Sequence, residues 1–115
     1  MVSKNQRVER PAKKTEYVIV FASTAAAKGW RDLRATMLNA LADAWDILTR
    51  DPKAVNATLH PLKGRLGLVT HRGENHVRRQ YELPKGARIW YYVEDGKPGT
   101  VHIVDVFTAH PNQTK

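Results

Sequence analysis

The sequence contains no cysteine, which excludes disulfides, thiol nucleophiles and thiolate metal ligands. That absence suits a reducing compartment, and we expect a cytoplasmic protein. Long apolar runs are also missing. The longest, residues 17–22, is far shorter than the roughly 20 residues that a membrane helix needs. The basic N-terminus is not followed by a signal-peptide core, so we expect no membrane attachment.

Two ligand-binding signatures are missing as well. No Gly-rich phosphate loop leads into a predicted helix, which argues against nucleotide hydrolysis. No two of the five histidines have the i, i+4 helical spacing of a zinc protease, and predicted strands separate them. We therefore expect neither a cofactor nor a metal site.

Positive charge is what the sequence has in excess. The 115 residues carry 19 Lys and Arg against 11 Asp and Glu, a net charge of +8, and 42% of them are hydrophobic. This length suits one domain with one core. The charge is typical of a polyanion binder, and nucleic acid is the leading partner. A charge that only maintains solubility, or that meets an acidic protein, is the alternative.

The N-terminal half predicts an arm, a strand and two helices. Residues 1–14 are basic and almost without apolar side chains, so they predict a flexible arm before a single domain at 15–115. Residues 17–21 are β-branched and aromatic, as in a buried strand. A helix is expected from Thr24 to about Leu33, and a second from Thr36 to Arg50, which Pro52 ends.

The C-terminal half predicts a meander of three or four antiparallel strands. Short β-rich runs separated by Gly and Pro turns occupy residues 66–71, 76–83, 88–94 and 101–107. The fold class is therefore α+β, in the order β-α-α-β-β-β(-β). We expect an antiparallel sheet with a helical hairpin packed on one face.

Alternation along these strands predicts which side chains face outward. In the 88–94 strand, Ile89, Tyr91 and Val93 suit the core, which leaves Arg88, Trp90 and Tyr92 on an open face. In the 76–83 strand, Tyr81 and Leu83 suit the core and send Arg78, Gln80 and Glu82 outward, with Arg79 undecided. Cations beside aromatic rings are suited to phosphate pairing and base stacking, which points to RNA.

Three further features carry a family resemblance. They are the Pro-Leu-Lys-Gly turn at 61–64, the Gly-Ala-Arg entry at 86–88 into an Ile-Trp-Tyr-Tyr-Val strand, and the terminal His110-Pro111. With them, residues 15–115 resemble the RelE/ParE superfamily of type II toxin–antitoxin toxins. The resemblance implies a metal-independent mRNA endonuclease that acts on the ribosome, contacts ribosomal RNA and is silenced by a cognate antitoxin.

The resemblance also implies roles for individual residues. His60 stands where some members carry the carboxylate that is regarded as the general base, Arg88 maps onto a phosphate-binding arginine, and His110 onto the group that closes the last strand. Lysines that other members use on the second strand map near residues 78–81.

Metal-free RNA cleavage needs proton removal from the 2′-OH, stabilisation of the charged phosphorane and proton donation to the 5′-oxygen. Histidine suits either proton transfer, so His60 and His110 are the candidates. Arg88 suits the charge-stabilising role, with Lys63 as a second cation. RNA binding is expected of Arg65, Arg72, Arg78, Arg79 and Trp90. A solvated basic face explains these arginines almost as well.

Two other functions stay open. The ParE branch shares the fold but inhibits DNA gyrase as a protein-binding toxin. A catalytically degenerate member would only bind an antitoxin or RNA. This alternative stays open because His60 replaces the carboxylate at the base position.

Overall fold

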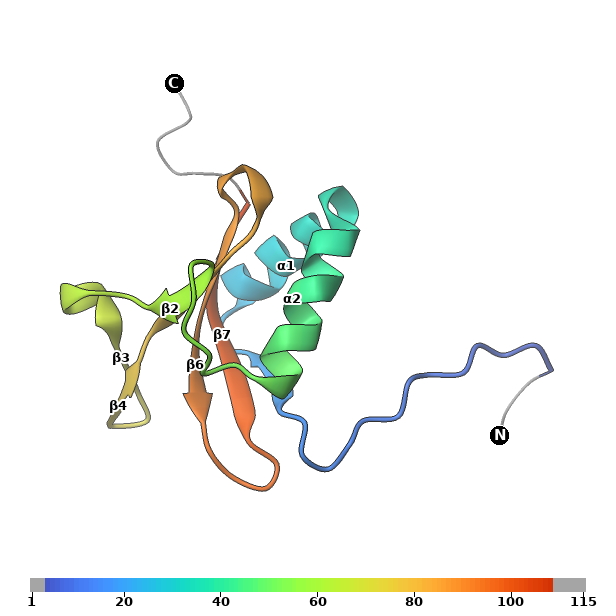
Figure 1. The fold of residues 1–115 in the computed structure, drawn as a ribbon, viewed down its shortest axis with the longest axis horizontal. Helices are drawn as coiled ribbons and strands as arrows, with labels where there is room; N and C mark the ends of the chain where they lie inside the picture. The colour runs from blue at the N-terminus through green and yellow to red at the C-terminus, as the bar shows by residue number, and fades with distance from the viewer. Residues whose placement is uncertain (1–3, 109–115) are drawn as a thin grey trace.

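The computed structural model describes residues 4–108 (Figure 1). Helices α1 (Thr24–Thr36) and α2 (Leu38–Arg50) lie together on one face of a sheet. The sheet holds β1 (Val18–Phe21), β2 (Leu59–Pro61), β5 (Arg79–Glu82), β6 (Arg88–Glu94) and β7 (Thr100–Phe107). The expected α+β class, with a helical hairpin on a mostly antiparallel sheet, is confirmed.

The order of strands in the five-stranded sheet is β1-β7-β6-β5-β2. Strands β7, β6, β5 and β2 pair in antiparallel fashion, whereas β1 runs parallel to β7. The predicted antiparallel meander is therefore confirmed for β5, β6 and β7, whereas the parallel pairing of β1 with β7 was not predicted. The β1–α1–α2 segment returns the chain so that β1 pairs with the last strand, and β6 becomes the central strand.

The two helices bury a continuous apolar stripe against the sheet. Ser23 caps α1 by accepting a hydrogen bond from the Ala26 amide at 3.0 Å. Buried side chains from both helices meet those of the central strands in one core, which contains Ala26, Leu33, Leu41, Ala44, Leu48, Ile89, Tyr91, Val101 and Ile103. Such burial is the main stabilising contribution to a domain of this size.

One expected strand divides into two. Residues 76–83 form the end of β4 (Glu74–Val77) and the whole of β5, and the break falls at Arg78. The Arg78 amide donates to the carbonyl of Gly67 (2.9 Å), and its carbonyl accepts from the Leu62 amide (2.9 Å). The backbone of Arg78 is therefore bonded to the segment that precedes the hairpin, and the chain changes sheets there.

Strand β4 pairs with β3 (Leu68–His71) in a separate two-stranded hairpin, seen at the left of Figure 1. Its turn is Arg72-Gly73, with φ of 54° and 79°. Two successive positive φ values are typical of the type I′ turn that matches strand twist. The predicted turn at Gly73 is confirmed, and Leu66, expected in a strand, lies in the short 3₁₀ helix η1 (Gly64–Gly67).

The smaller differences lie at element ends. Helix α1 continues to Thr36, three residues past its predicted end, and α2 begins at Leu38. Strand β2, which was not predicted, has only three residues and ends in a proline. A second 3₁₀ turn, η2 (Pro84–Gly86), occupies the predicted turn before β6.

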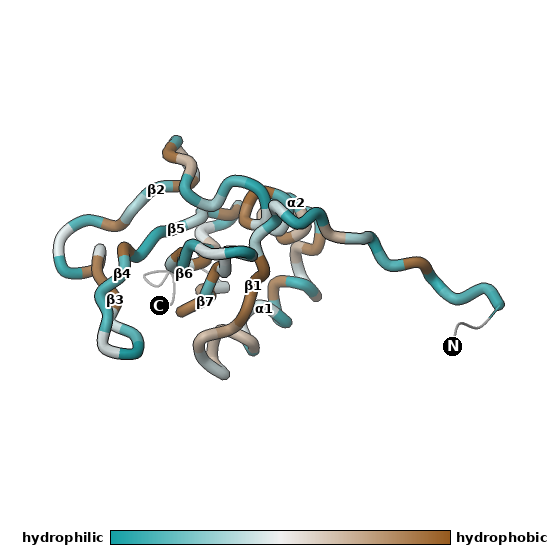
Figure 2. The backbone as a smooth tube through the Cα atoms, turned by 90° about the horizontal axis from the view of Figure 1, so that it is seen from below, coloured by the Kyte–Doolittle hydropathy of each residue, from teal (hydrophilic) through white to brown (hydrophobic). Residues whose placement is uncertain are grey.

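Residues 4–14 contain no helix or strand and are exposed. They run away from the sheet and helices, and most are hydrophilic (Figures 1 and 2). Arg10 holds the end of this segment to the domain through hydrogen bonds of 2.8 and 3.2 Å to the Glu16 carboxylate. Those bonds, with one from the Lys13 amide, keep the pKa of Glu16 below its ordinary value.

Within residues 4–108, no helix is long and apolar enough to cross a membrane.

Helix α1 approaches β7 so closely at Gly29 that a side chain does not fit. A Cβ there would lie 2.8 Å from both the Cβ and the carbonyl oxygen of Val106. Gly29→Ala should therefore destabilise the protein by about 1–3 kcal/mol through overpacking, despite a gain of up to about 1 kcal/mol in helix propensity. Urea denaturation measures the difference. Arg31→Gly, at an exposed site, measures propensity alone in the same helix, and a stabilised Gly29→Ala protein would contradict the close approach.

Candidate functional site

The sheet face opposite the helices gathers several of the site residues predicted from the sequence. We call it the open face and define it by His60, Gln80, Glu82, Arg88, Trp90, Asp105 and Phe107, with Arg78 at its edge. Register places these residues together: Trp90 pairs with Gln80 on one side and with Asp105 on the other, and Arg88 pairs with Glu82 and Phe107. Directly opposed residues point to the same side of a sheet.

A register shift in β7 shapes this face. Trp90 pairs with Asp105, but the next residue, Tyr91, pairs with Ile103, so Val104 is an extra residue. A bulge of this kind re-aims the side chains beyond it. It lets Asp105 and Phe107 face the open side while Ile103 stays in the core.

Two arginines flank an indole at the centre of the open face. The Arg78 Cζ lies 5.3 Å from the Trp90 ring centroid, and the Arg88 Cζ lies 6.0 Å from it. Arg88 also lies 4.8 Å from the Phe107 ring, whose centroid is 4.8 Å from that of Trp90 in an edge-on arrangement. Cation–π contacts therefore hold both guanidinium groups beside aromatic surfaces.

The Nε atoms of Arg78 and Arg88 are buried, and in the described part of the chain neither has a hydrogen-bond acceptor. A buried donor without an acceptor is costly, by about 1–3 kcal/mol in typical cases. An oxyanion would suit the remaining donors of these groups, because guanidinium donors bind carboxylate and phosphate oxygens in a fork.

A chain of hydrogen bonds links His60 to Trp90. The His60 Nε2 lies 3.3 Å from Oε2 of Glu82, which also accepts from the Gln80 side-chain amide at 3.2 Å. The Trp90 Nε1–H donates to Oε1 of Gln80 at 2.8 Å. The His60 Nδ1 faces the carbonyl oxygen of Pro61 at 3.1 Å. Both ring nitrogens thus lie within hydrogen-bonding distance of an oxygen atom.

A cavity of about 230 Å³ opens beside this chain. It is lined by Gln80, Glu82, Leu83, Gly86, Ala87 and Arg88. A carboxylate and a guanidinium from neighbouring strands therefore border one hollow, next to the His60–Glu82 pair.

Asp105 is a half-buried carboxyl on the same face. Burial raises its pKa above the ordinary value, and the positive charge of Arg78 opposes this effect. A carboxyl whose pKa is raised in this way holds a proton more readily near neutral pH than an exposed one.

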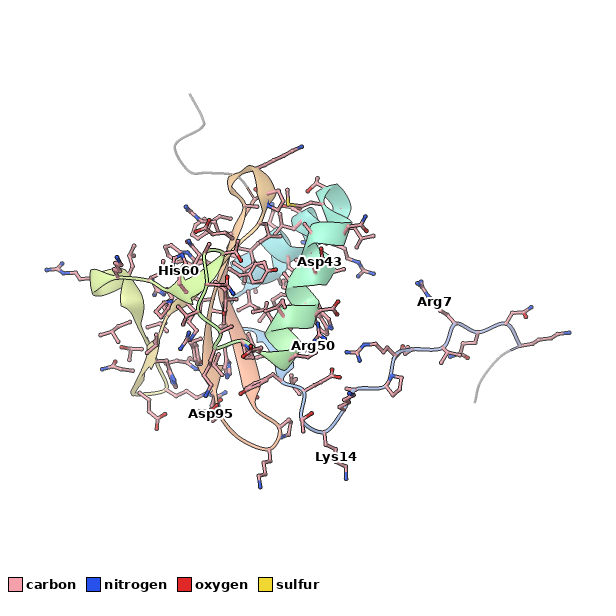
Figure 3. The ribbon with its side chains drawn as sticks, in the orientation of Figure 1. Arg7, Lys14, Asp43, Arg50, His60 and Asp95 are labelled. Carbon is pink, nitrogen blue, oxygen red and sulfur yellow. The ribbon has the colours of Figure 1, made fainter. Side chains whose placement is uncertain are left out.

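The structure brings together four of the nine residues named from the sequence: His60, Arg78, Arg88 and Trp90. Lys63 and Arg65 are exposed in and beside η1, and Arg72 is exposed at the hairpin tip. Arg79 pairs with Tyr91 and so points to the helix side of the sheet, away from Arg78. His110 lies outside the described residues. Figure 3 shows His60 on the hairpin side of the sheet, away from Asp43 and Arg50 on α2.

The exposure of Tyr92 differs from the prediction. Tyr92 points to the same side as Trp90, as alternation requires, but is only 1% exposed. The β3–β4 hairpin covers it, with the His76 ring centroid 4.2 Å from its own. The open face is therefore shorter than the sequence predicts, because alternation gives the side of a residue but not what folds over it.

Sequence reasoning gave no role to Gln80, Glu82, Asp105 or Phe107. The alternation of β5 placed Gln80 and Glu82 outward, so a signal for them was present. Asp105 and Phe107 depend on the bulge at Val104, which nothing in the sequence marks.

Comparison with protein-family models, with curated proteins and with solved structures gave no match. Function is therefore inferred from the residues of this chain.

The raised pKa of Asp105 generates a stability prediction. When the folded-state pKa of a carboxyl lies above its unfolded value of about 3.9, the charged form destabilises the fold, and the penalty is present above the folded pKa. Asp105→Asn should thus stabilise the protein at about pH 7, by less than about 1 kcal/mol because the group is partly solvated. The gain should shrink toward about pH 4, as urea denaturation at both pH values will show. Equal stability differences at the two pH values would exclude Asp105 as their source.

Proposed function

We propose that this protein is the toxin of a type II toxin–antitoxin system, an endoribonuclease that cleaves ribosome-bound mRNA without a metal ion. The observation that carries the proposal is the open face, where two guanidinium groups with buried, unbonded Nε atoms flank an indole beside a His–Glu pair. The resemblance to RelE-like toxins supports the same reading.

The aromatic and cationic groups suit single-stranded RNA. Trp90 and Phe107 offer rings on which bases stack, a contact worth about 1–3 kcal/mol per base in other proteins. The guanidinium groups of Arg78 and Arg88 would hold phosphate oxygens between the stacked bases. Lys63, Arg65 and Arg72, which are exposed, would contact the RNA backbone further from the reaction centre.

The chemistry we propose is attack by the ribose 2′-oxygen on the adjacent phosphorus. The 2′-OH proton passes to one histidine, the P–O5′ bond breaks, and the 5′-oxygen takes up a proton from the other, leaving a 2′,3′-cyclic phosphate and a 5′-OH. Arg88 stabilises the phosphorane, as a preorganised donor does at a developing oxyanion. We assign the two proton transfers to His60 and His110, the histidines nominated from the sequence, with Glu82 orienting the His60 ring.

The cellular location and the partners of the protein follow from this proposed chemistry. A protein that cleaves mRNA during translation acts in the cytoplasm, and its positive charge suits contacts with ribosomal RNA. An uncontrolled enzyme of this kind stops growth, so a cognate antitoxin protein is part of the proposal.

Arg88→Ala should reduce mRNA cleavage by 10²- to 10³-fold, the usual cost of about 3–4 kcal/mol for losing one such donor. Arg88→Lys should recover only part of the rate, since a point charge does not replace the fork of donors. Mapping of mRNA 5′ ends after induction in cells, together with growth curves, measures the effect.

Arg50→Ala is the matched control, because Arg50 is an exposed arginine of α2 on the other side of the molecule (Figure 3). It should leave cleavage unchanged. Cleavage that persists in Arg88→Ala would remove the open face as the reactive site. Growth arrest with DNA damage and intact mRNA would favour gyrase inhibition instead.

A further inference from the structure

Three histidines without a role in the proposed reaction gather around Tyr92. The phenol ring is stacked between two imidazoles, that of His76 at 4.2 Å and that of His102 at 4.5 Å between centroids, with interplanar angles of 23° and 6°. The three rings come from three strands, β6, β4 and β7. They form one continuous stack between the hairpin and the sheet.

His71 and Glu94 complete this group, which we call the histidine stack. The His71 Nδ1 shares a hydrogen bond with the Tyr92 hydroxyl, and the His71 ring centroid lies 5.7 Å from those of both Tyr92 and His102. The His102 Nε2 lies 2.9 Å from Oε1 of Glu94. Within residues 4–108, no group of three or more His, Asp and Glu side chains is arranged to hold a metal ion.

The histidine stack is what holds the β3–β4 hairpin to the sheet at its far end. At the near end, backbone bonds of Arg78 to Leu62 and Gly67 fix the base. Leu68 and Val77, on the outer face of the hairpin, are 56% and 47% exposed. Only Val69, His71 and His76 are partly buried on its inner face. The hairpin therefore closes mainly through titratable rings.

We propose that the β3–β4 hairpin is a flap over Tyr92 and His102, at one end of the open face, held shut by the histidine stack and released when its imidazoles take up protons. The flap would regulate the site of the proposed function, so its effect on RNA rests on that function. The opening of the hairpin on protonation does not depend on that function.

The charged groups that face the stack determine whether protonation opens or closes the hairpin. The hairpin contributes His71, Arg72, Glu74 and His76, and the sheet contributes Tyr92, Glu94 and His102. With every imidazole protonated, four positive groups face two carboxylates. His71 and His102 would then be like charges with ring centroids only 5.7 Å apart, and like charges at that separation repel.

Neither Tyr92 nor Glu94 cancels this repulsion by changing its own charge. Burial raises the pKa of Tyr92, so the phenol stays neutral at and below neutral pH. The hydrogen bond from His102 holds the pKa of Glu94 below its ordinary value, so the carboxylate is already charged before the histidines titrate. The imidazoles are thus left as the groups of the stack that can take up protons.

Release of the flap would lengthen the stacking surface offered to RNA. Tyr92 lies one step beyond Trp90 on the same side of β6, and His102, its partner in β7, lies one step beyond Asp105 on that side. Once uncovered, they add a second pair of rings to the first, and aromatic rings are what unpaired bases stack on.

The absence of cysteine allows two labels to be placed without background. Asn75→Cys, on the outer face of the hairpin, and Ala42→Cys, exposed on α2, would carry spin labels for pulsed distance measurement in the absence of RNA. The distance should be single and narrow at about pH 7.5, and longer and broader at about pH 5, with a midpoint in the range where histidines titrate. Far-UV circular dichroism should stay native throughout.

His71→Gln combined with His76→Gln should abolish most of this pH response, whereas His60→Gln, a histidine outside the stack, should retain it. An unchanged wild-type distance, the same response in the double variant, or a distance change that accompanies global unfolding would each overturn the flap. A protein that shows the pH-dependent distance but cleaves no RNA would retain the flap and refute only the proposed nuclease.

Discussion

The rest of the structure depends on strand β6, which packs one row of side chains against the helices and presents the other row on the open face. Its core row, Ile89 and Tyr91, is fully buried, and the Tyr91 hydroxyl donates to the Pro52 carbonyl at 2.7 Å. This bond ties the central strand to the segment that follows α2. Burial raises the pKa of Tyr91, which remains a neutral donor. A buried hydroxyl without this acceptor would cost about 1–3 kcal/mol, so the core fixes which row of β6 faces outward.

Local pattern was sufficient for most of this arrangement. Strand β6 has the predicted bounds, 88–94, and its two rows face the predicted sides, because period-two alternation sits beside unambiguous core residues. The helical hairpin follows from the apolar spacing around Leu41, Ala44 and Leu48. In each case the information lies within a few residues of the element that it describes.

Long-range pairing was the part that local pattern could not supply. The parallel β1–β7 ladder joins residues about 80 positions apart, and the bulge at Val104 appears only once β7 is aligned with β6. The site shows the same division. Arg88 and Trp90 follow from alternation, whereas Asp105 and the covering of Tyr92 depend on register and on how the hairpin folds.

The two edges of the five-stranded sheet are unequal as templates for further strands. Strand β2 ends one side, and its three residues close with Pro61, which has no amide to donate to another strand. Strand β1 ends the other side with four residues, among which Val18 and Val20 are exposed. The two edges thus differ in backbone donors: the β2 edge lacks an amide at Pro61, whereas every residue of β1 keeps its amide.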